Sequence, residues 1–171
     1  MFELSHQTAQ FTNLNLRAEK HGDENAPGAD LTCSVRMPND VLSEFHSSLK
    51  STFYRAPEPG EMDMVDKAQE EPLALTRLRF GKYADSLAWR DEIVGATFTV
   101  HYGTGGKSDV KLDDATIDKF QFEFMDGGTT FIKFRVKCNP DEKQIGKLYG
   151  LIGGEIEVSL EVPSNAMEAA A

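Results

Sequence analysis

The sequence predicts an α+β fold: a mainly antiparallel sheet of about seven to nine hairpin-connected strands, with two covering helices. Several segments alternate apolar and polar side chains, which is the period of a strand that buries one face. Gly, Asn and Asp gather between those segments, as they do in turns. Two other segments repeat their apolar residues at helical spacing. We therefore expect one α+β domain over residues 1–163, with residues 164–171 as a frayed tail.

The first two strands are predicted to form a hairpin. Residues 11–18 and residues 30–37 each alternate apolar and polar side chains. Residues 19–29 between them are polar and contain Gly, Asn and Pro, which is typical of a loop. Pro38 should end the second strand, because proline has no N–H to donate to a neighbouring strand.

A helix is predicted over residues 39–54. Asn39 or Asp40 can cap its start, and Pro57 follows its expected end. The apolar residues that recur at helical spacing are Val41, Leu42, Phe45, Leu49 and Phe53.

Residues 56–72 are predicted to be a mobile acidic loop. From Pro57 to Pro72 the chain holds six acidic residues, three prolines and one lysine. Such a segment buries too little apolar surface to offset the entropy lost on ordering.

Four more strands are expected at residues 73–80, 86–91, 96–102 and 110–112, since each alternates apolar and polar side chains. The glycine-rich residues 103–109 should join the last two as a hairpin.

The largest hairpin is predicted within residues 118–138. Asp126, Gly127 and Gly128 form its turn, and Gly128 can take a left-handed conformation without a steric penalty. Each inward side chain contributes roughly 1.5–3 kcal/mol if fully buried. In the expected register Phe122 faces Ile132 and Phe120 faces Phe134. The inward set is Phe120, Phe122, Phe124, Ile132, Phe134 and Val136.

A second helix should begin at Asn139 and Pro140, a capping residue followed by a residue suited to the first helical turn. Its expected buried stripe is Ile145, Leu148, Tyr149 and Ile152. Residues 155–162 form a last strand with outward glutamates, and this strand is expected at a sheet edge that would also permit a homodimer. The order hairpin, corner, helix occurs twice, so a duplicated ββα unit is one interpretation.

The net charge of −10 argues against unassisted binding to a phosphate backbone. No apolar run approaches the ~20 residues that cross a bilayer, and the first residues show no secretion signal. We therefore expect a cytoplasmic protein without a membrane partner. Cys33 and Cys138 are predicted to be buried free thiols rather than a disulfide.

No catalytic residue, metal site or cofactor is expected. Residues 103–108 end in Gly-Lys-Ser like a phosphate-binding loop, but His101 stands where that motif needs glycine and a strand follows instead of a helix. The four histidines lack the paired spacing of metal ligands. The sequence therefore predicts that the protein is not an enzyme.

Two surfaces are candidates for binding, and both interpretations stay open. The first is acidic and would present carboxylates to a basic partner, as a DNA mimic does. The second combines cations with aromatic rings, which suits single-stranded nucleic acid. The acidic candidates are Glu58, Glu61, Asp63, Asp66, Glu70 and Glu71, together with the last-strand glutamates Glu155, Glu157 and Glu161. The basic candidates are Arg77, Arg79, Lys82, Arg90, Lys107 and Lys111.

Several short segments resemble an uncharacterised family of small proteins of tailed bacteriophages and prophages, often encoded near recombination and replication genes. They are HGDE at 21–24, PNDVL at 38–42, YGTGGKSD at 102–109 and DGGT at 126–129. The resemblance covers nearly the whole chain and implies a phage protein acting in the cytoplasm of its host. It supplies no catalytic residues.

The expected function is therefore that of a non-enzymatic phage binding protein. Through its acidic surface it would engage a host or phage protein, for example to inhibit a protein that handles nucleic acid or acts in host defence. The alternative is an accessory protein of phage recombination or replication that binds single-stranded DNA. The two differ in the sign of the charge that faces the partner.

Overall fold

The computed structural model describes residues 1–62, 64 and 74–163. The expected tail at 164–171 and most of the expected acidic loop lie outside the described residues. The chain divides into two compact units. Unit 1 comprises Met1–Val35, Ala88–Gln121 and the chain from Lys133 onward, and unit 2 comprises Arg36–Leu87 and Phe122–Ile132.

Antiparallel strands dominate, as predicted, but they do not form an open layer. Among the described residues the main sheet has the order β5-β7-β6-β9-β1-β2-β8, and β7 also pairs with β8. Six strands thus close into a barrel, and β5 lies beside β7 outside the closed ring. The expectation of a sheet covered by two helices is wrong, because closure is set by which ladders pair and not by the period of any one strand. The strands are β1 (Leu4–His21), β2 (Glu24–Pro38), β5 (Ser86–Trp89), β6 (Ile93–His101), β7 (Val110–Met125), β8 (Thr129–Cys138) and β9 (Glu155–Glu161).

Aromatic side chains form the core of unit 1. Phe2 packs edge-on against Phe120 and Phe134, with ring centroids 5.8 and 5.9 Å apart. Phe120 and Phe134 lie 6.3 Å from each other, in agreement with the predicted pairing. Phe2 precedes the first strand and belongs to no periodic segment, so the sequence pattern missed it.

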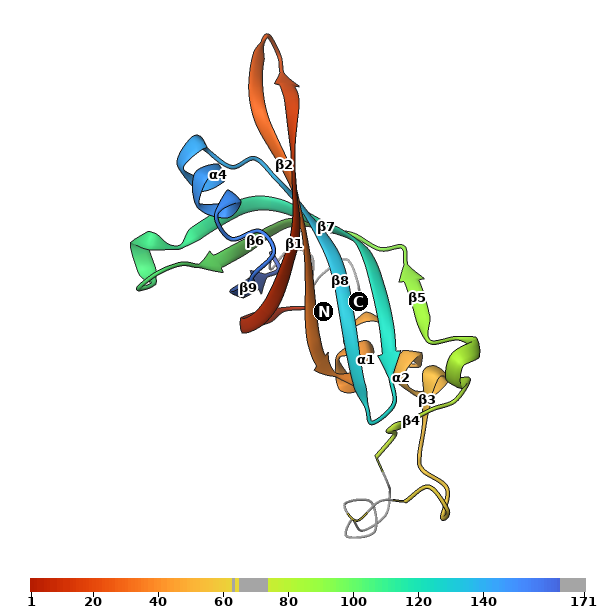
Figure 1. Ribbon diagram of the computed structural model, residues 1–171. Helices are drawn as coiled ribbons and strands as arrows, with labels where there is room; N and C mark the ends of the chain where they lie inside the picture. Colours follow the sequence, from red (N-terminus) through yellow and green to blue (C-terminus); the bar gives the residue numbers. More distant parts are fainter. Residues whose placement is uncertain (63, 65–73, 164–171) are drawn as a thin grey trace. The chain divides into compact units, whose positions relative to one another are not determined.

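The first hairpin is longer than predicted. β1 and β2 stay paired out to His21 and Glu24, so residues 19–29 are mostly strand and not a loop. Figure 1 shows this hairpin, in red and orange, as a long two-stranded arm. Leu16 on the arm is 53% exposed, whereas Leu31 nearer its base is fully buried. Backbone hydrogen bonds between the strands replace the apolar burial that the alternation implied.

The hairpin of β6 and β7 forms as predicted around residues 103–109, which include a short 3-10 turn, Gly106–Ser108. Phe98 and Val100 are buried, but Tyr102, which the same alternation puts on the inward side, is 38% exposed. β7 is also one continuous strand from Val110, and not two separate strands.

The second helix, α4 (Glu142–Tyr149), is shorter than expected. Its cap is Asp141, which exchanges hydrogen bonds with Gln144 in a capping box, and not Asn139. Leu148 is buried, while Tyr149 is 73% exposed. The predicted apolar stripe is therefore wrong at Tyr149 and also at Ile152, which is 38% exposed and lies beyond the end of α4. A helix of eight residues has only about two turns, so few of its side chains can face the barrel.

Unit 2 contains short elements in place of the single helix predicted over residues 39–54. The backbone of His46 is extended (φ −158°), and its ring accepts a hydrogen bond from the backbone N–H of Ser48. This local bond competes with helical hydrogen bonding and breaks the helix. The two segments of the expected ββα repeat therefore differ in structure. The elements are a 3-10 turn at Asn39–Val41, α1 (Leu42–Phe45), α2 (Leu49–Phe53), β3 (Tyr54–Arg55), β4 (Arg77–Leu78) and a 3-10 turn at Gly81–Tyr83.

Tyr54 joins these short elements to the turn of the β7–β8 hairpin. Its side chain is fully buried, and its hydroxyl lies 2.7 Å from the carbonyl oxygen of Thr129 and 3.1 Å from the backbone nitrogen of Met125. Burial raises the pKa of Tyr54. The neutral hydroxyl donates to the first group and accepts from the second.

Within the residues that the structure describes, no helix has the length and apolar character needed to span a lipid bilayer.

Candidate functional site: an acidic face with two histidines

β9 was expected at a sheet edge, but it lies between β6 and β1 in the barrel. The edge prediction is wrong because both sides of β9 are paired, to β1 from Leu4 to Gln10 and to β6 from Thr97 to His101. The alternation itself is confirmed: Ile156, Val158 and Leu160 are buried. The outward residues of β9 therefore stand in the middle of a three-stranded wall.

We call this outer surface the β9 face. It consists of the outward residues of β9 and two histidines from the neighbouring strands: Glu155, Glu157, Ser159, Glu161, His6 and His101.

The residues opposite the glutamates do not neutralise them with lysine or arginine. Directly opposite residues of paired antiparallel strands lie on the same face. Along β1, Gln10 is opposite Glu155. Along β6, Thr97 is opposite Glu161. In the described register the glutamates thus face neutral or histidine side chains.

His6 reaches the β9 face from a β-bulge in β1. Leu4 pairs with Leu160 and Gln7 with Val158, so two residues of β1 oppose Ser159. His6 has a positive φ of 47°, which is uncommon for a residue other than glycine. Bulges re-aim side chains and are frequent next to functional sites. The backbone N–H of His6 donates to the hydroxyl of Ser159 (3.0 Å), which holds the bulge in place.

The side chains of His6 and Glu157 are in contact. His6 Nδ1 lies 2.5 Å from Glu157 Oε1, and the two side chains are 65% and 50% exposed. The ring of His6 also stacks on His101, with centroids 4.1 Å apart and planes 13° from parallel. His6 therefore extends over β9 from one neighbouring strand to the other.

His101 is held from both ring nitrogens. Its Nδ1 lies 3.1 Å from Asp109 Oδ2, and its Nε2 lies 2.8 Å from Ser159 Oγ. The backbone N–H of Tyr102 donates to Asp109 (2.9 Å), and this bond, followed by the His101 contact, lowers the pKa of Asp109. In the neutral imidazole, the Asp109 carboxylate accepts the Nδ1 proton of His101 in a hydrogen bond, and the lone pair is then on Nε2.

The expected acidic loop contributes less than predicted within the described residues. Glu58 is exposed, and Glu61 is bound through both oxygens to Arg55 at 2.7 and 2.8 Å. The Arg55 guanidinium lowers the pKa of Glu61 to about 2. Glu61 therefore forms an ion pair with an arginine six positions before it in the chain. The candidates Asp63, Asp66, Glu70 and Glu71 lie outside the described residues.

The expected basic strip is divided between the two units. Arg77, Arg79 and Lys82 belong to unit 2, and Arg90, Lys107 and Lys111 belong to unit 1. In unit 2, Arg77 donates to the carbonyl of Glu61 (2.9 Å) and Arg79 to the carbonyl of Ser51 (3.1 Å). These guanidinium groups bind the protein's own backbone, which reduces their availability to a phosphate.

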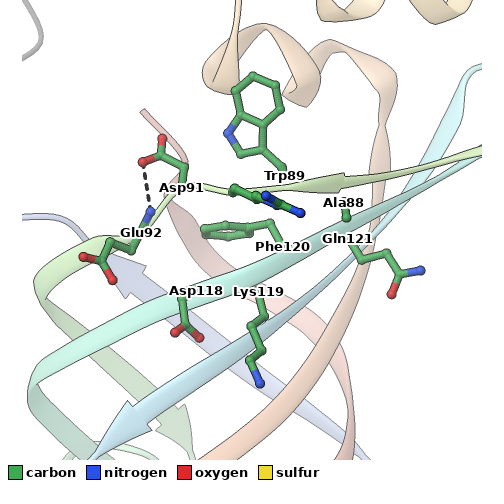
Figure 2. A pocket seen from close by; sticks show the side chains of 9 residues that line it. Ala88, Trp89, Asp91, Glu92, Asp118, Lys119, Phe120 and Gln121 are labelled. Atoms are coloured by element: carbon green, nitrogen blue, oxygen red, sulfur yellow. Dashed lines mark hydrogen bonds between the residues drawn. The ribbon is translucent and has the colours of Figure 1, made fainter.

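In unit 1, Lys111 lies 3.4 Å from Asp113, while Arg90 and Lys107 are exposed. Arg90 lies beside a hollow of about 640 Å³ that β5 and β7 line. Figure 2 shows Asp91 and Glu92 on one side of this hollow, and Asp118 next to Lys119 pointing away from the Trp89 ring. Asp91 and Glu92 would repel a phosphate, whereas Asp118 is paired with Arg135.

Comparisons with known proteins give no relative: no protein-family model, curated protein or solved structure matches this chain. The β9 face is therefore interpreted from its own geometry.

Sequence reasoning found the three outward glutamates but missed the histidines. The strand period puts His101 on the outward side of its strand, and His6 belongs to no predicted element. They are 95 positions apart in the chain, and no spacing signal connects residues that meet only through strand order.

Proposed function

We propose that the protein is a non-enzymatic binding protein that presents the β9 face to a cationic surface of another protein. The observation that favours this function is the row of glutamates at the centre of the paired wall β6-β9-β1, opposite residues that are neutral or histidine.

The spacing of the row makes the charges act together. Alternate residues of a strand lie about 6.7 Å apart, which is shorter than the Debye length of ≈ 8 Å at physiological ionic strength. The fields of Glu155 and Glu157 therefore add at the surface. A ladder paired on both sides also keeps the carboxylates at fixed spacing, so less conformational entropy is lost on binding than with a loop.

The class of partner follows from this charge. A row of fixed carboxylates complements the Lys and Arg surface with which proteins bind nucleic acid. The resemblance to phage proteins makes a host or phage protein of that kind the proposed partner, in the cytoplasm, with inhibition by mimicry of DNA as the proposed effect. The proposed acidic binding surface is therefore on β9, and not mainly in the predicted loop at 56–72.

The test compares three forms of the full chain as baits in a bacterial lysate. They are the wild type, Glu155→Gln/Glu161→Gln, and the control Glu44→Gln/Asp85→Asn, which changes the net charge equally at exposed positions of unit 2. We expect one protein recovered in a fixed ratio by the wild type and the control, with at least about tenfold weaker binding to the β9 variant. Double-stranded DNA should compete for that protein.

Equal recovery by all three baits would refute the role of the β9 face. A gel-shift titration with single-stranded DNA tests the alternative function. Tight, salt-dependent binding that Lys107→Ala weakens would favour the nucleic-acid-binding protein instead.

A further inference from the structure

Three potential metal ligands meet on the β9 face. His6, His101 and Glu157 each offer a ligand atom, and these atoms all lie within 4.8 Å of one another. They come from β1, β6 and β9, three neighbouring strands of unit 1. The paired backbone therefore fixes the Cα positions of the three residues. Rotation of their side chains can bring the three ligand atoms to one metal ion.

We propose that His6, His101 and Glu157 form a binding site for a divalent transition-metal ion such as Zn²⁺. Two imidazoles and one carboxylate are ligands that zinc and its neighbours in the transition series accept, whereas Ca²⁺ and Mg²⁺ favour sets of oxygen ligands. Three protein ligands leave a fourth tetrahedral position for water or for a group of a binding partner. This proposal departs from the sequence-based expectation of no metal site.

The hydrogen-bond partner of His101 Nδ1 supports this assignment. Metal-binding histidines usually donate their other ring N–H to a carboxylate or carbonyl group, which orients the ring. Asp109 has this position: its Oδ2 lies 3.1 Å from Nδ1, and the side chains of His101 and Asp109 are only 18% and 15% exposed. The lone pair of Nε2 is then directed toward Ser159 on the β9 face, next to Glu157. Asp109 is thus a positioning residue.

Binding of a metal ion would require two changes in the present arrangement of side chains. Two ligands at about 2.0–2.1 Å from a tetrahedral ion are about 3.3 Å apart, so the 2.5 Å contact between His6 Nδ1 and Glu157 Oε1 must open by nearly 1 Å. The stacked rings must also turn, because a histidine binds metal in the plane of its ring. His6 can make this movement, since its side chain is 65% exposed.

The test is calorimetric titration of the tag-free full chain with ZnCl₂. We expect saturable binding of one ion per chain. Glu157→Gln and His6→Asn should each weaken the affinity at least about 100-fold, and Asp109→Asn about 10–100-fold. Asparagine is chosen at His6 because it tolerates positive φ. The control variant His46→Asn, which lies in unit 2, keeps all three ligands and should bind zinc within about threefold of the wild type.

A second measurement on the wild type does not depend on any variant folding. Zn²⁺ added to isotope-labelled protein should shift the NMR signals of His6, His101 and Glu157, and bound Co²⁺ should show visible absorption bands of a tetrahedral site. The proposal is overturned if zinc does not saturate, if the shifts occur elsewhere, or if the ligand variants bind like the wild type.

The metal site does not require the protein partner proposed above. Glu155→Gln/Glu161→Gln keeps all three ligands and should bind zinc normally, whereas His6→Asn keeps all three glutamates of the β9 face. The two proposals can therefore fail separately.

Discussion

Replacing Tyr54 with phenylalanine removes one oxygen atom from an enclosed polar contact in unit 2. The hydroxyl donates to the carbonyl of Thr129 (2.7 Å) and accepts from the backbone N–H of Met125 (3.1 Å), and the Thr130 hydroxyl lies 3.3 Å away. Phenylalanine keeps the ring and its edge-on contact with Phe124 (6.0 Å). The substitution therefore tests the polar contacts without creating a large cavity.

The expected loss follows from the groups that lose their partner. A buried donor or acceptor left without a hydrogen bond costs roughly 1–3 kcal/mol. The Thr129 carbonyl and the Met125 N–H both lose the Tyr54 oxygen, so Tyr54→Phe should lower the free energy of unfolding by about 2–4 kcal/mol. For a chain of this length the midpoint of thermal unfolding should fall by roughly 5–15 °C.

Urea denaturation followed by circular dichroism measures this loss, provided that the wild type and the variant have equal m-values. The matched control is Tyr83→Phe, which removes the same atom from a side chain that is 88% exposed. This control should change stability by less than about 0.5 kcal/mol. A Tyr54→Phe variant as stable as the control would show that the hydroxyl does not hold the β7–β8 turn, and the reasoning would be wrong.

Three further predictions concern the thiols, an ion pair and the hairpin turn. Burial raises the pKa of Cys33 and of Cys138 from 9.0 to about 12. Above pH 9 the unfolded chain releases thiol protons that the folded chain retains, so the free energy of unfolding should fall by up to about 1.4 kcal/mol per pH unit for each thiol. The midpoints of urea unfolding at about pH 8 and about pH 10 should therefore differ less when both cysteines are replaced by alanine. Asp118→Asn removes the carboxylate that binds Arg135 at 2.6 and 2.7 Å in a partly buried pair; we expect a loss of about 1–2 kcal/mol in chemical denaturation, and a loss near zero would contradict a structural role. Gly128→Ala should lower the free energy of unfolding by roughly 1–2 kcal/mol, because Gly128 has a φ of 84° that alanine disfavours. An unchanged melting temperature would show that the turn adopts another conformation.

The amino-acid sequence alone is enough to predict the local features of this protein. The alternation of Phe120, Phe122 and Phe124 predicts their burial, and the structure leaves each at most 2% exposed. The Asp126-Gly127-Gly128 turn is also local, since its residues must accept positive φ within a short connection, as Gly127 and Gly128 do. The excess of acidic residues is a property of composition.

Local patterns misled where hydrogen bonding replaced burial or broke a helix. Residues 19–29 are mostly polar and read as a loop, yet backbone pairing extends the strands through most of them. Residues 41–53 have helical periodicity, but the ring of His46 accepts the Ser48 N–H and interrupts the helix. Periodicity reports which side chains are apolar and not which backbone bonds form.

The closed barrel and the composition of the β9 face depend on strand pairing, which only the tertiary structure shows. Pairing of β7 with β8 closes the ring, and insertion of β9 between β6 and β1 brings His6 to within stacking distance of His101. Side-chain alternation specifies which face of a strand is buried, whereas the identity of the neighbouring strand depends on the free energy of the whole set of ladders. The glutamates of β9 were visible in the chain as outward residues, and their place at the centre of a paired wall, beside two histidines, came from strand order.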